Sequence, residues 1–146
     1  MEEGINLKKI WSDDDCVEID VATSDGSSAF RTRVYVGHAQ LAELVAGLDR
    51  FKGQIHGGMY DARLGEFGPE FAGGAFHARL HFHQPGHGRI FITVHTESAW
   101  HDFTLSKVAS RATLYLTTEP ALFDNFIVEL GRLKAGEADE ALLSCK

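Results

Sequence analysis

The chain has 146 residues, of which 44% are hydrophobic and 24% are charged. These values are typical of a folded single domain and exclude intrinsic disorder. No apolar run approaches the roughly 20 residues that a membrane-spanning helix needs. The N-terminal Met-Glu-Glu-Gly also lacks the basic start of a secretory signal. We therefore expect one α+β domain over residues 1–146, located in the cytoplasm and without a membrane partner.

The charge and the cysteines narrow the classes of partner. A net charge of −7 disfavours binding to nucleic acid and favours a protein partner with a basic surface. The two cysteines, Cys16 and Cys145, form no CxxC pair, so we expect free thiols. Nothing in the composition excludes a homo-oligomer.

The N-terminal third of the chain predicts a β-hairpin. Apolar and polar residues alternate over residues 17–21 and again over 30–36, and the dipeptide Asp25-Gly26 between them is typical of tight turns. Folding the arms about this dipeptide predicts two cross-strand ion pairs: Asp20 opposite Arg31, and Glu18 opposite Arg33.

Two segments predict amphipathic helices. From about residue 39 to 51 the period changes to three and four, with one apolar stripe ending at Phe51. A second helix follows Thr118-Glu119-Pro120, with Thr118 as the N-cap and Pro120 in the first turn. Its apolar stripe comprises Leu122, Phe123, Phe126, Ile127, Leu130 and Leu133.

Residues 75–97 predict the central hairpin of the fold, with a turn about Gly86. Phe82 then faces Ile90 on the apolar side, and His77 faces His95 on the other. Elsewhere we expect a loop over 54–74 with a short strand at 63–67, strands at 103–108 and 111–117, and a brief helical tail at 137–146. Together these elements predict an antiparallel sheet of about six strands with two helices packed on one face. The similar order of strands before each helix also allows an internal strand-strand-helix duplication.

The eight histidines are the unusual feature of the composition, and several share one face of the central hairpin. His-x-His on a strand places two imidazoles on one side, and a neighbouring strand can add a third, as zinc and iron sites require. The candidate ligands are His77, His81, His83 and His95. The alternative is that these histidines are ordinary residues of a half-exposed sheet face with no cofactor.

Other patterns of catalytic chemistry are weak. Cys16 lies beside acidic residues, which disfavour a thiolate, and the adjacent His101-Asp102 cannot form a catalytic pair merely as neighbours in sequence. The acidic run Asp13-Asp14-Asp15 lacks the spacing of a calcium loop. We therefore favour a protein that is not an enzyme and has no catalytic residue.

Exposed aromatic and acidic residues predict a docking surface instead. Aromatic side chains are favoured at protein interfaces. The candidates are Trp11, Trp100, Tyr35, Tyr60 and Tyr115, together with the acidic residues between Asp13 and Asp20 and with Glu66 and Glu70.

The layout of the chain also resembles a known group of proteins. It is carried by the opening strands, Leu41-x-x-Leu44 to Phe51, a glycine-rich loop before Gly74-Ala75-Phe76, the turn Gly86-His87-Gly88, and the helix after Thr118-Glu119-Pro120. This pattern resembles small uncharacterised bacterial proteins, some of which are grouped with immunity proteins that neutralise polymorphic toxins. The resemblance implies an α+β fold and a non-catalytic inhibitor of a toxin or other protein partner. The alternative function is a metal-binding protein or metalloenzyme that uses the histidine face.

Overall fold

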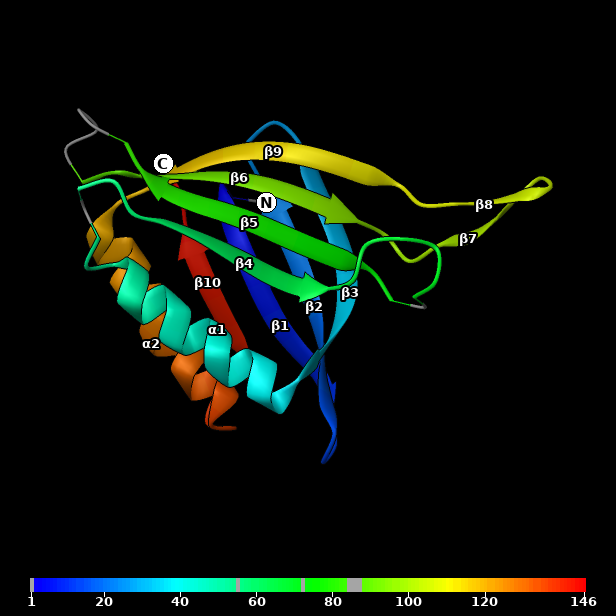
Figure 1. Cartoon of the computed structure of the whole chain (residues 1–146), viewed down its shortest axis with the longest axis horizontal. Coiled ribbons are helices and arrows are strands. Elements are labelled where there is room, and N and C mark those ends of the chain that lie inside the picture. Colours follow the sequence, from blue (N-terminus) through cyan, green and yellow to red (C-terminus); the bar gives the residue numbers. More distant parts are fainter. Residues whose placement is uncertain (1, 55, 72, 84–87) are drawn as a thin grey trace.

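The chain folds into two four-stranded antiparallel sheets, two helices and a projecting two-stranded ribbon (Figure 1). The structure is a computed structural model and describes residues 2–54, 56–71, 73–83 and 88–146. Sheet A has the order β10-β1-β2-β3, with β1 at Gly4–Ser12, β2 at Cys16–Ser24, β3 at Ala29–Gly37 and β10 at Glu140–Ser144. Sheet B has the order β4-β5-β6-β9, with β4 at Met59–Gly65, β5 at Ala75–Phe82, β6 at Ile90–Glu97 and β9 at Arg111–Thr118. The ribbon pairs β7 (His101–Phe103) with β8 (Ser106–Val108).

The two helices lie side by side and share one hydrophobic core with both sheets. Helix α1 spans His38–Phe51 and lies beside β4, and α2 spans Pro120–Lys134 and lies beside β10 (Figure 1). The predicted apolar stripes are buried in both helices except for Leu122, which is half-buried. Phe51 of α1 packs edge-to-face on Phe123 of α2 at 5.9 Å between ring centroids. Neither helix is long and apolar enough, over the residues described, to cross a membrane.

The α+β class and the antiparallel pairing are confirmed, but the strands form two sheets instead of one sheet of about six. Alternation along a strand tells which side chains share a face, whereas it does not tell which strands are neighbours. Strands β1 and β10 were not predicted, and they complete sheet A at the end away from β3.

The register of the central hairpin is confirmed over the described residues. Phe82 pairs with Ile90 and His77 pairs with His95. The predicted turn about Gly86 lies outside the described residues. Because apolar and polar faces both favour the same pairing, the register follows from the pattern alone.

The register of the first hairpin differs from the predicted one by two residues. Asp20 pairs with Arg33, and the hairpin closes at Ser24 and Ala29 around a four-residue loop. The carboxylate of Asp25 accepts hydrogen bonds from the main-chain N–H groups of Ser27 and Ser28, which stabilises the longer loop. A shift of two residues keeps every side chain on its face. The predicted ion pairs of Arg31 with Asp20 and of Arg33 with Glu18 therefore form as diagonal contacts.

Four local predictions differ from the structure. The strand expected at 63–67 is β4, which begins at Met59, and the strand expected at 103–108 is the ribbon of β7 and β8. Thr118 is not the N-cap of α2: the cap is Glu119, and the buried Thr118 hydroxyl donates to the main-chain oxygen of Ser144. That bond belongs to the end of the chain, which forms strand β10 beside β1 instead of a helical tail.

The elements occur twice in the same order along the chain. The first half runs β1-β2-β3-α1-β4 and the second runs β5-β6-β9-α2-β10, with the ribbon inserted between β6 and β9. The last strand of each half pairs with the first strand of the other: β4 with β5, and β10 with β1.

Candidate functional site

The outer face of sheet B carries a polar row that includes two of the predicted histidines. His77 of β5 stacks on His95 of β6, with 6.0 Å between ring centroids. The Nε2 atom of His77 lies 2.8 Å from Oδ1 of Asp61, and Nδ1 of His95 lies 3.1 Å from Oγ1 of Thr113. The row therefore crosses all four strands of the sheet, from Asp61 on β4 to Thr113 on β9.

Asp61 organises one end of this row. Its Oδ1 accepts a hydrogen bond of 2.8 Å from Nε of Arg79, and its Oδ2 lies 3.3 Å from Nη2 of Arg79. Hydrogen bonding to Arg79 lowers the pKa of Asp61 to about 2, and the contact with His77 acts in the same direction. Asp61 is therefore ionised at neutral pH and holds the ring of His77 in place.

The other two predicted histidines pack on a different residue. His81 stacks on Phe91 at 5.8 Å, and His83 meets the same ring edge-on at 6.1 Å. The structure thus brings the four candidate ligands together as two pairs. Within residues 2–54, 56–71, 73–83 and 88–146, no three His, Cys, Asp or Glu side chains are grouped as a metal ion requires.

The second candidate region is the ribbon of β7 and β8, here called the arm (residues 98–110), which projects from the body of the molecule (Figure 1). Its tip is apolar, because Phe103 is 63% exposed and Leu105 is fully exposed. Thr104, between them, has a positive φ of 57°. For a residue other than glycine this conformation is uncommon and costs about 1 kcal/mol.

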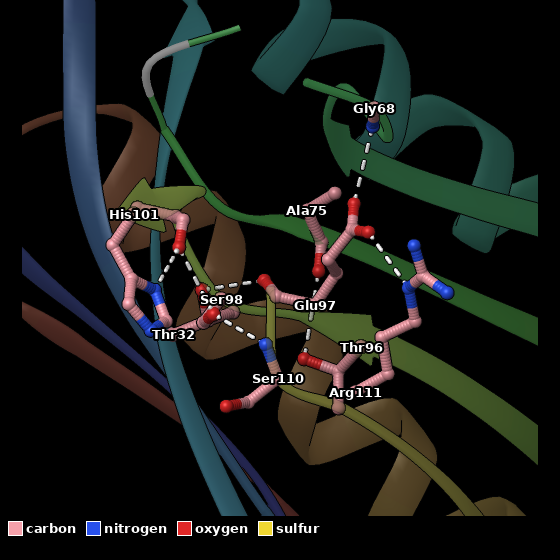
Figure 2. Close-up of polar contacts among 10 residues, drawn as sticks. Thr32, Gly68, Ala75, Thr96, Glu97, Ser98, His101, Ser110 and Arg111 are labelled. Carbon is pink, nitrogen blue, oxygen red and sulfur yellow. Dashed lines mark hydrogen bonds and ion pairs between the residues drawn. The ribbon is translucent and has the colours of Figure 1, made fainter. Parts of the chain in front are cut away.

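A buried carboxylate fastens the base of the arm to the body (Figure 2). The side chain of Glu97 is only 3% exposed, and its Oε1 accepts a hydrogen bond of 2.9 Å from Nε of Arg111. Its Oε2 accepts one of 3.2 Å from the main-chain N–H of Gly68. Glu97 therefore ties together the end of β6, the start of β9 and the loop before β5.

Further contacts hold the same base. The hydroxyl of Thr32 on β3 donates to the main-chain oxygen of Glu97 at 2.8 Å, which links the two sheets (Figure 2). The two segments of the arm pair where they leave the body, because Ser98 N–H donates to Ser110 O and Ser110 N–H donates to Ser98 Oγ. The guanidinium of Arg111 lies over the ring of Trp100, 5.6 Å from its centroid. The arm therefore leaves the body in a defined direction.

An open cleft of about 590 Å³ lies beside the base of the arm. Its floor is the outer face of β2 and β3, and its wall includes Ser98 and Ala99 of the arm. The two arginines in it are each about 70% exposed, whereas their acidic partners are mostly buried. The charged and aromatic residues that line the cleft are Glu18, Asp20, Arg31, Arg33 and Tyr35. The cleft is thus polar and close to charge-balanced.

The predicted docking residues divide between exposed and half-buried positions. Trp11, Tyr35 and Tyr115 are exposed, whereas Tyr60 and Trp100 are half-buried. The acidic stretch also divides, because Glu18 and Asp20 pair with arginines while the turn at 13–15 is exposed. In that turn, Oδ1 of Asp13 accepts hydrogen bonds from the N–H groups of Asp15 and Cys16.

The thiols are poor nucleophiles in this structure. Desolvation, together with the carboxylates of Asp13, Asp15 and Glu18, raises the pKa of Cys16. Burial raises the pKa of the Cys145 thiol to about 12. Both cysteines are free. The adjacent His101 and Asp102 lie exposed on β7.

Sequence reasoning missed Glu97 and the arm. Glu97 alternates with the buried residues of β6, so the sequence pattern places it on the exposed face. The loop around Gly68 and the segment after β6 bury it there. The exposed Phe-Thr-Leu at 103–105 was the available signal, because it places two large apolar residues around a turn.

Comparisons of the chain with models of protein families, with curated proteins and with solved structures found no match.

Proposed function

We propose that this chain is a non-catalytic binding protein that engages a protein partner through the arm and the cleft at its base. The observation that carries the proposal is the apolar tip, Phe103 and Leu105, held away from the body on a fastened ribbon. Burying a Phe or Leu side chain contributes roughly 1.5–3 kcal/mol. Two such side chains on one tip make an anchor of the size that dominates small protein interfaces.

The construction of the arm supports this use. Free loops lose conformational entropy when they bind, and a segment that is already ordered loses less. The arm is ordered by its strand pairing and by Glu97, which holds Arg111 and Gly68. The charges and aromatic ring of the cleft at the base of the arm supply polar contacts in addition to the apolar anchor at its tip.

An inhibitor is the form of binding that agrees with both the sequence and the arm. A projecting ribbon suits a partner with a concave site, which it occupies sterically. The net charge of −7 favours a partner with a basic surface and accelerates its association. We therefore propose, as the most specific function, that the chain is an immunity-like inhibitor of a toxin domain and that it acts in the cytoplasm.

Site-specific crosslinking tests the proposal. A photoreactive residue in place of Leu105 is used to capture the partner in cells, and the captured protein is identified and purified. The affinity of that partner is then measured for the wild type, for the double variant Phe103→Ser/Leu105→Ser and for Val128→Ser. Val128 is a matched control, because it is 64% exposed on α2, away from the arm. We expect the dissociation constant to rise at least about tenfold for the arm variant only. An unchanged affinity of the arm variant would contradict the proposal.

The metal-binding alternative is favoured by one observation, the stacking of His77 on His95 beside the ionised Asp61. Under this alternative, zinc or iron binds at the histidine face, with His81 and His83 as further ligands. Calorimetric titration of untagged protein with zinc tests it, with the variant His95→Gln as the comparison. Stoichiometric binding that His95→Gln abolishes supports a metal site, and no binding removes it.

We also propose that the two halves of the chain arose by duplication with exchange of their last strands. The support is the repeated order of elements and the reciprocal pairing of β4 with β5 and of β10 with β1. If this is right, a circular permutant that joins residue 146 to residue 2 by a short linker and opens between Pro69 and Glu70 folds. A permutant that is unfolded by circular dichroism counts against the proposal.

A further inference from the structure

The loop between β4 and β5 forms a small pocket next to the cleft, at the end of the molecule from which the arm projects (Figure 1). The residues that line this pocket, here called the loop pocket, are Tyr35, Gly65, Glu66, Phe71, Gly73 and Gly74. Its volume is about 210 Å³, and it shares Tyr35 and Gly73 with the cleft. Pockets that hold a whole small molecule measure roughly 300–1,000 Å³. The loop pocket is therefore of a size to take one protruding side chain.

Two exposed aromatic rings line the loop pocket. Tyr35 is 51% exposed and Phe71 is 43% exposed. The hydroxyl of Tyr35 donates to the carboxylate of Glu18, and this hydrogen bond raises the pKa of Tyr35. A Cβ atom at Gly73 would lie 3.0 Å from Cδ2 of Tyr35, so the ring is also packed closely against the loop. The pocket thus offers aromatic rings, whose faces carry partial negative charge and attract cations.

The loop pocket also contains a carboxylate that has no partner in the described part of the chain. Glu66 is exposed, and no hydrogen bond or ion pair joins its side chain to another described residue. Arg33, in the neighbouring cleft, lies 3.9 Å from a carboxylate oxygen of Glu18, which offsets its charge there. The pocket is therefore negative and would repel an anion. An apolar side chain would remove water from Glu66 without replacing it, which is unfavourable.

The loop that carries these side chains is held in place at three glycines. Gly68 N–H donates to Oε2 of Glu97 at 3.2 Å, and Gly74 N–H donates to a main-chain oxygen of β3 at 2.8 Å. Gly65 has a φ of +72°, and a Cβ atom on it would lie 2.3 Å from the main-chain oxygen of Gly74. Because Glu97 also accepts from Arg111, one carboxylate positions both the loop and the base of the arm. A pocket that is already ordered loses less conformational entropy on binding.

We infer that the loop pocket binds an arginine side chain of the protein partner. A guanidinium stacks on aromatic faces and forms paired hydrogen bonds with a carboxylate, and it is less strongly hydrated than the ammonium group of lysine. The rings of Tyr35 and Phe71 and the carboxylate of Glu66 offer both kinds of contact in one pocket. The net charge of −7 favours an occupant of the same sign. The assignment of the arginine to a protein partner rests on the proposed function.

Titration of the full chain with acetyl-arginine amide, followed by nuclear magnetic resonance, tests the pocket without the partner. Acetyl-citrulline amide is the control probe, because citrulline has nearly the same shape as arginine and no charge. We expect only the arginine probe to shift the amide signals of Gly65, Gly73 and Gly74, with a dissociation constant on the order of 10 mM. Equal shifts with both probes, or no shift of these signals up to about 100 mM of the arginine probe, would overturn the inference.

Two matched pairs of variants in the same loop locate the binding. Glu66→Gln removes the charge of the pocket, and we expect it to raise the dissociation constant of the arginine probe at least about fivefold. Glu70→Gln is its control, because Glu70 is exposed in the same loop outside the pocket lining. Phe71→Leu raises the dissociation constant about threefold, whereas Phe67→Leu, at a position that is 41% exposed, leaves it unchanged. Equal effects of Glu66→Gln and Glu70→Gln would contradict the pocket, because the probe would then respond only to the charge of the loop.

The role of the pocket in partner binding is measured separately. For the partner captured through Leu105, we expect Glu66→Gln to raise the dissociation constant about fivefold and Glu70→Gln to leave it unchanged. An unchanged affinity of Glu66→Gln for the partner would overturn the assignment to the partner, even where the arginine probe binds. The proposed function would still stand if the arm variant Phe103→Ser/Leu105→Ser lost binding, so the two failures are distinguishable.

Discussion

The two halves of the molecule differ most in the connection between their second and third strands. In the first half, β2 and β3 are joined by the four residues 25–28, which form a tight loop. In the second half, β6 and β9 are joined by residues 98–110, which form the arm. Since a four-residue loop is enough to join the corresponding strands, the fold does not require the arm. Under the proposed function, residues 98–110 serve binding, and the strands and helices around them serve stability.

The largest effect expected from this comparison concerns the helices, where the halves are alike. Leu48 of α1 and Leu130 of α2 are both almost completely buried at corresponding places in their apolar stripes. We expect Leu48→Ala and Leu130→Ala each to lower the free energy of unfolding by about 2–5 kcal/mol, because each leaves a cavity in the shared core. Urea denaturation measures the effect. Separate unfolding transitions for the two halves would break the comparison, because they would show two independent cores.

The next largest effect concerns Glu97, the buried carboxylate at the base of the arm. Arg111→Ala leaves Glu97 buried without its cation, and we expect it to cost about 3 kcal/mol. Glu97→Gln costs less, about 1–2 kcal/mol, because the neutral amide oxygen still accepts from Gly68 N–H. Chemical denaturation at neutral pH distinguishes the two. An equal or reversed order would show that Glu97 is not held by Arg111 in solution.

A smaller effect is expected in acid, from Asp61 on the outer face of sheet B. The pKa of Asp61 is lowered from its ordinary value of 3.8 to about 2 in the folded chain. Its stabilising contribution is therefore complete above about pH 4 and is lost as the pH falls toward 2. Because Asp61 is partly exposed, solvent screening keeps this contribution below about 2 kcal/mol. Thermal unfolding followed from pH 5 to pH 2 should show a shallower loss for Asp61→Asn than for the wild type.

The smallest effect on stability is expected when the arm itself is removed. Replacing residues 98–110 by the loop Asp-Gly-Ser-Ser of the first half shortens the connection, which favours folding by about 1 kcal/mol. The lost contact of Trp100 with Arg111 costs about as much. We therefore expect a melting temperature within a few degrees of that of the wild type and complete loss of partner binding. An unfolded chain would show that the arm is part of the fold.

The sequence predicts those features of the fold that depend on local alternation. The pairing of His77 with His95 and the buried stripes of both helices are confirmed, because each residue's neighbours along the chain already favour one face. The first hairpin shows the limit of this reasoning. Its ion pairs were predicted, but the register was wrong by two residues, because Asp25 holds two N–H groups and so lengthens the loop.

The features that were not predicted depend on residues far apart in sequence. Residues 140–144 read as a helical tail, and they form a strand only because β1 lies beside them. Glu97 is buried by Gly68, 29 residues earlier in the chain, and by the segment that follows β6. Neither partner is visible in the local pattern. For the same reason the candidate metal ligands could be placed on one face from the sequence, whereas their separation into two pairs could not.

The pairing of β1 with β10 has a consequence for synthesis on the ribosome. Strand β1 emerges before its neighbour on one side, Glu140–Ser144, which is translated more than 120 residues later. At about 5–20 residues per second, the first strand therefore waits for several seconds with one side unsatisfied. During that interval the nascent chain is open to intrusion by other polypeptides, so chaperone contact should concentrate on residues 4–12 until translation passes residue 144.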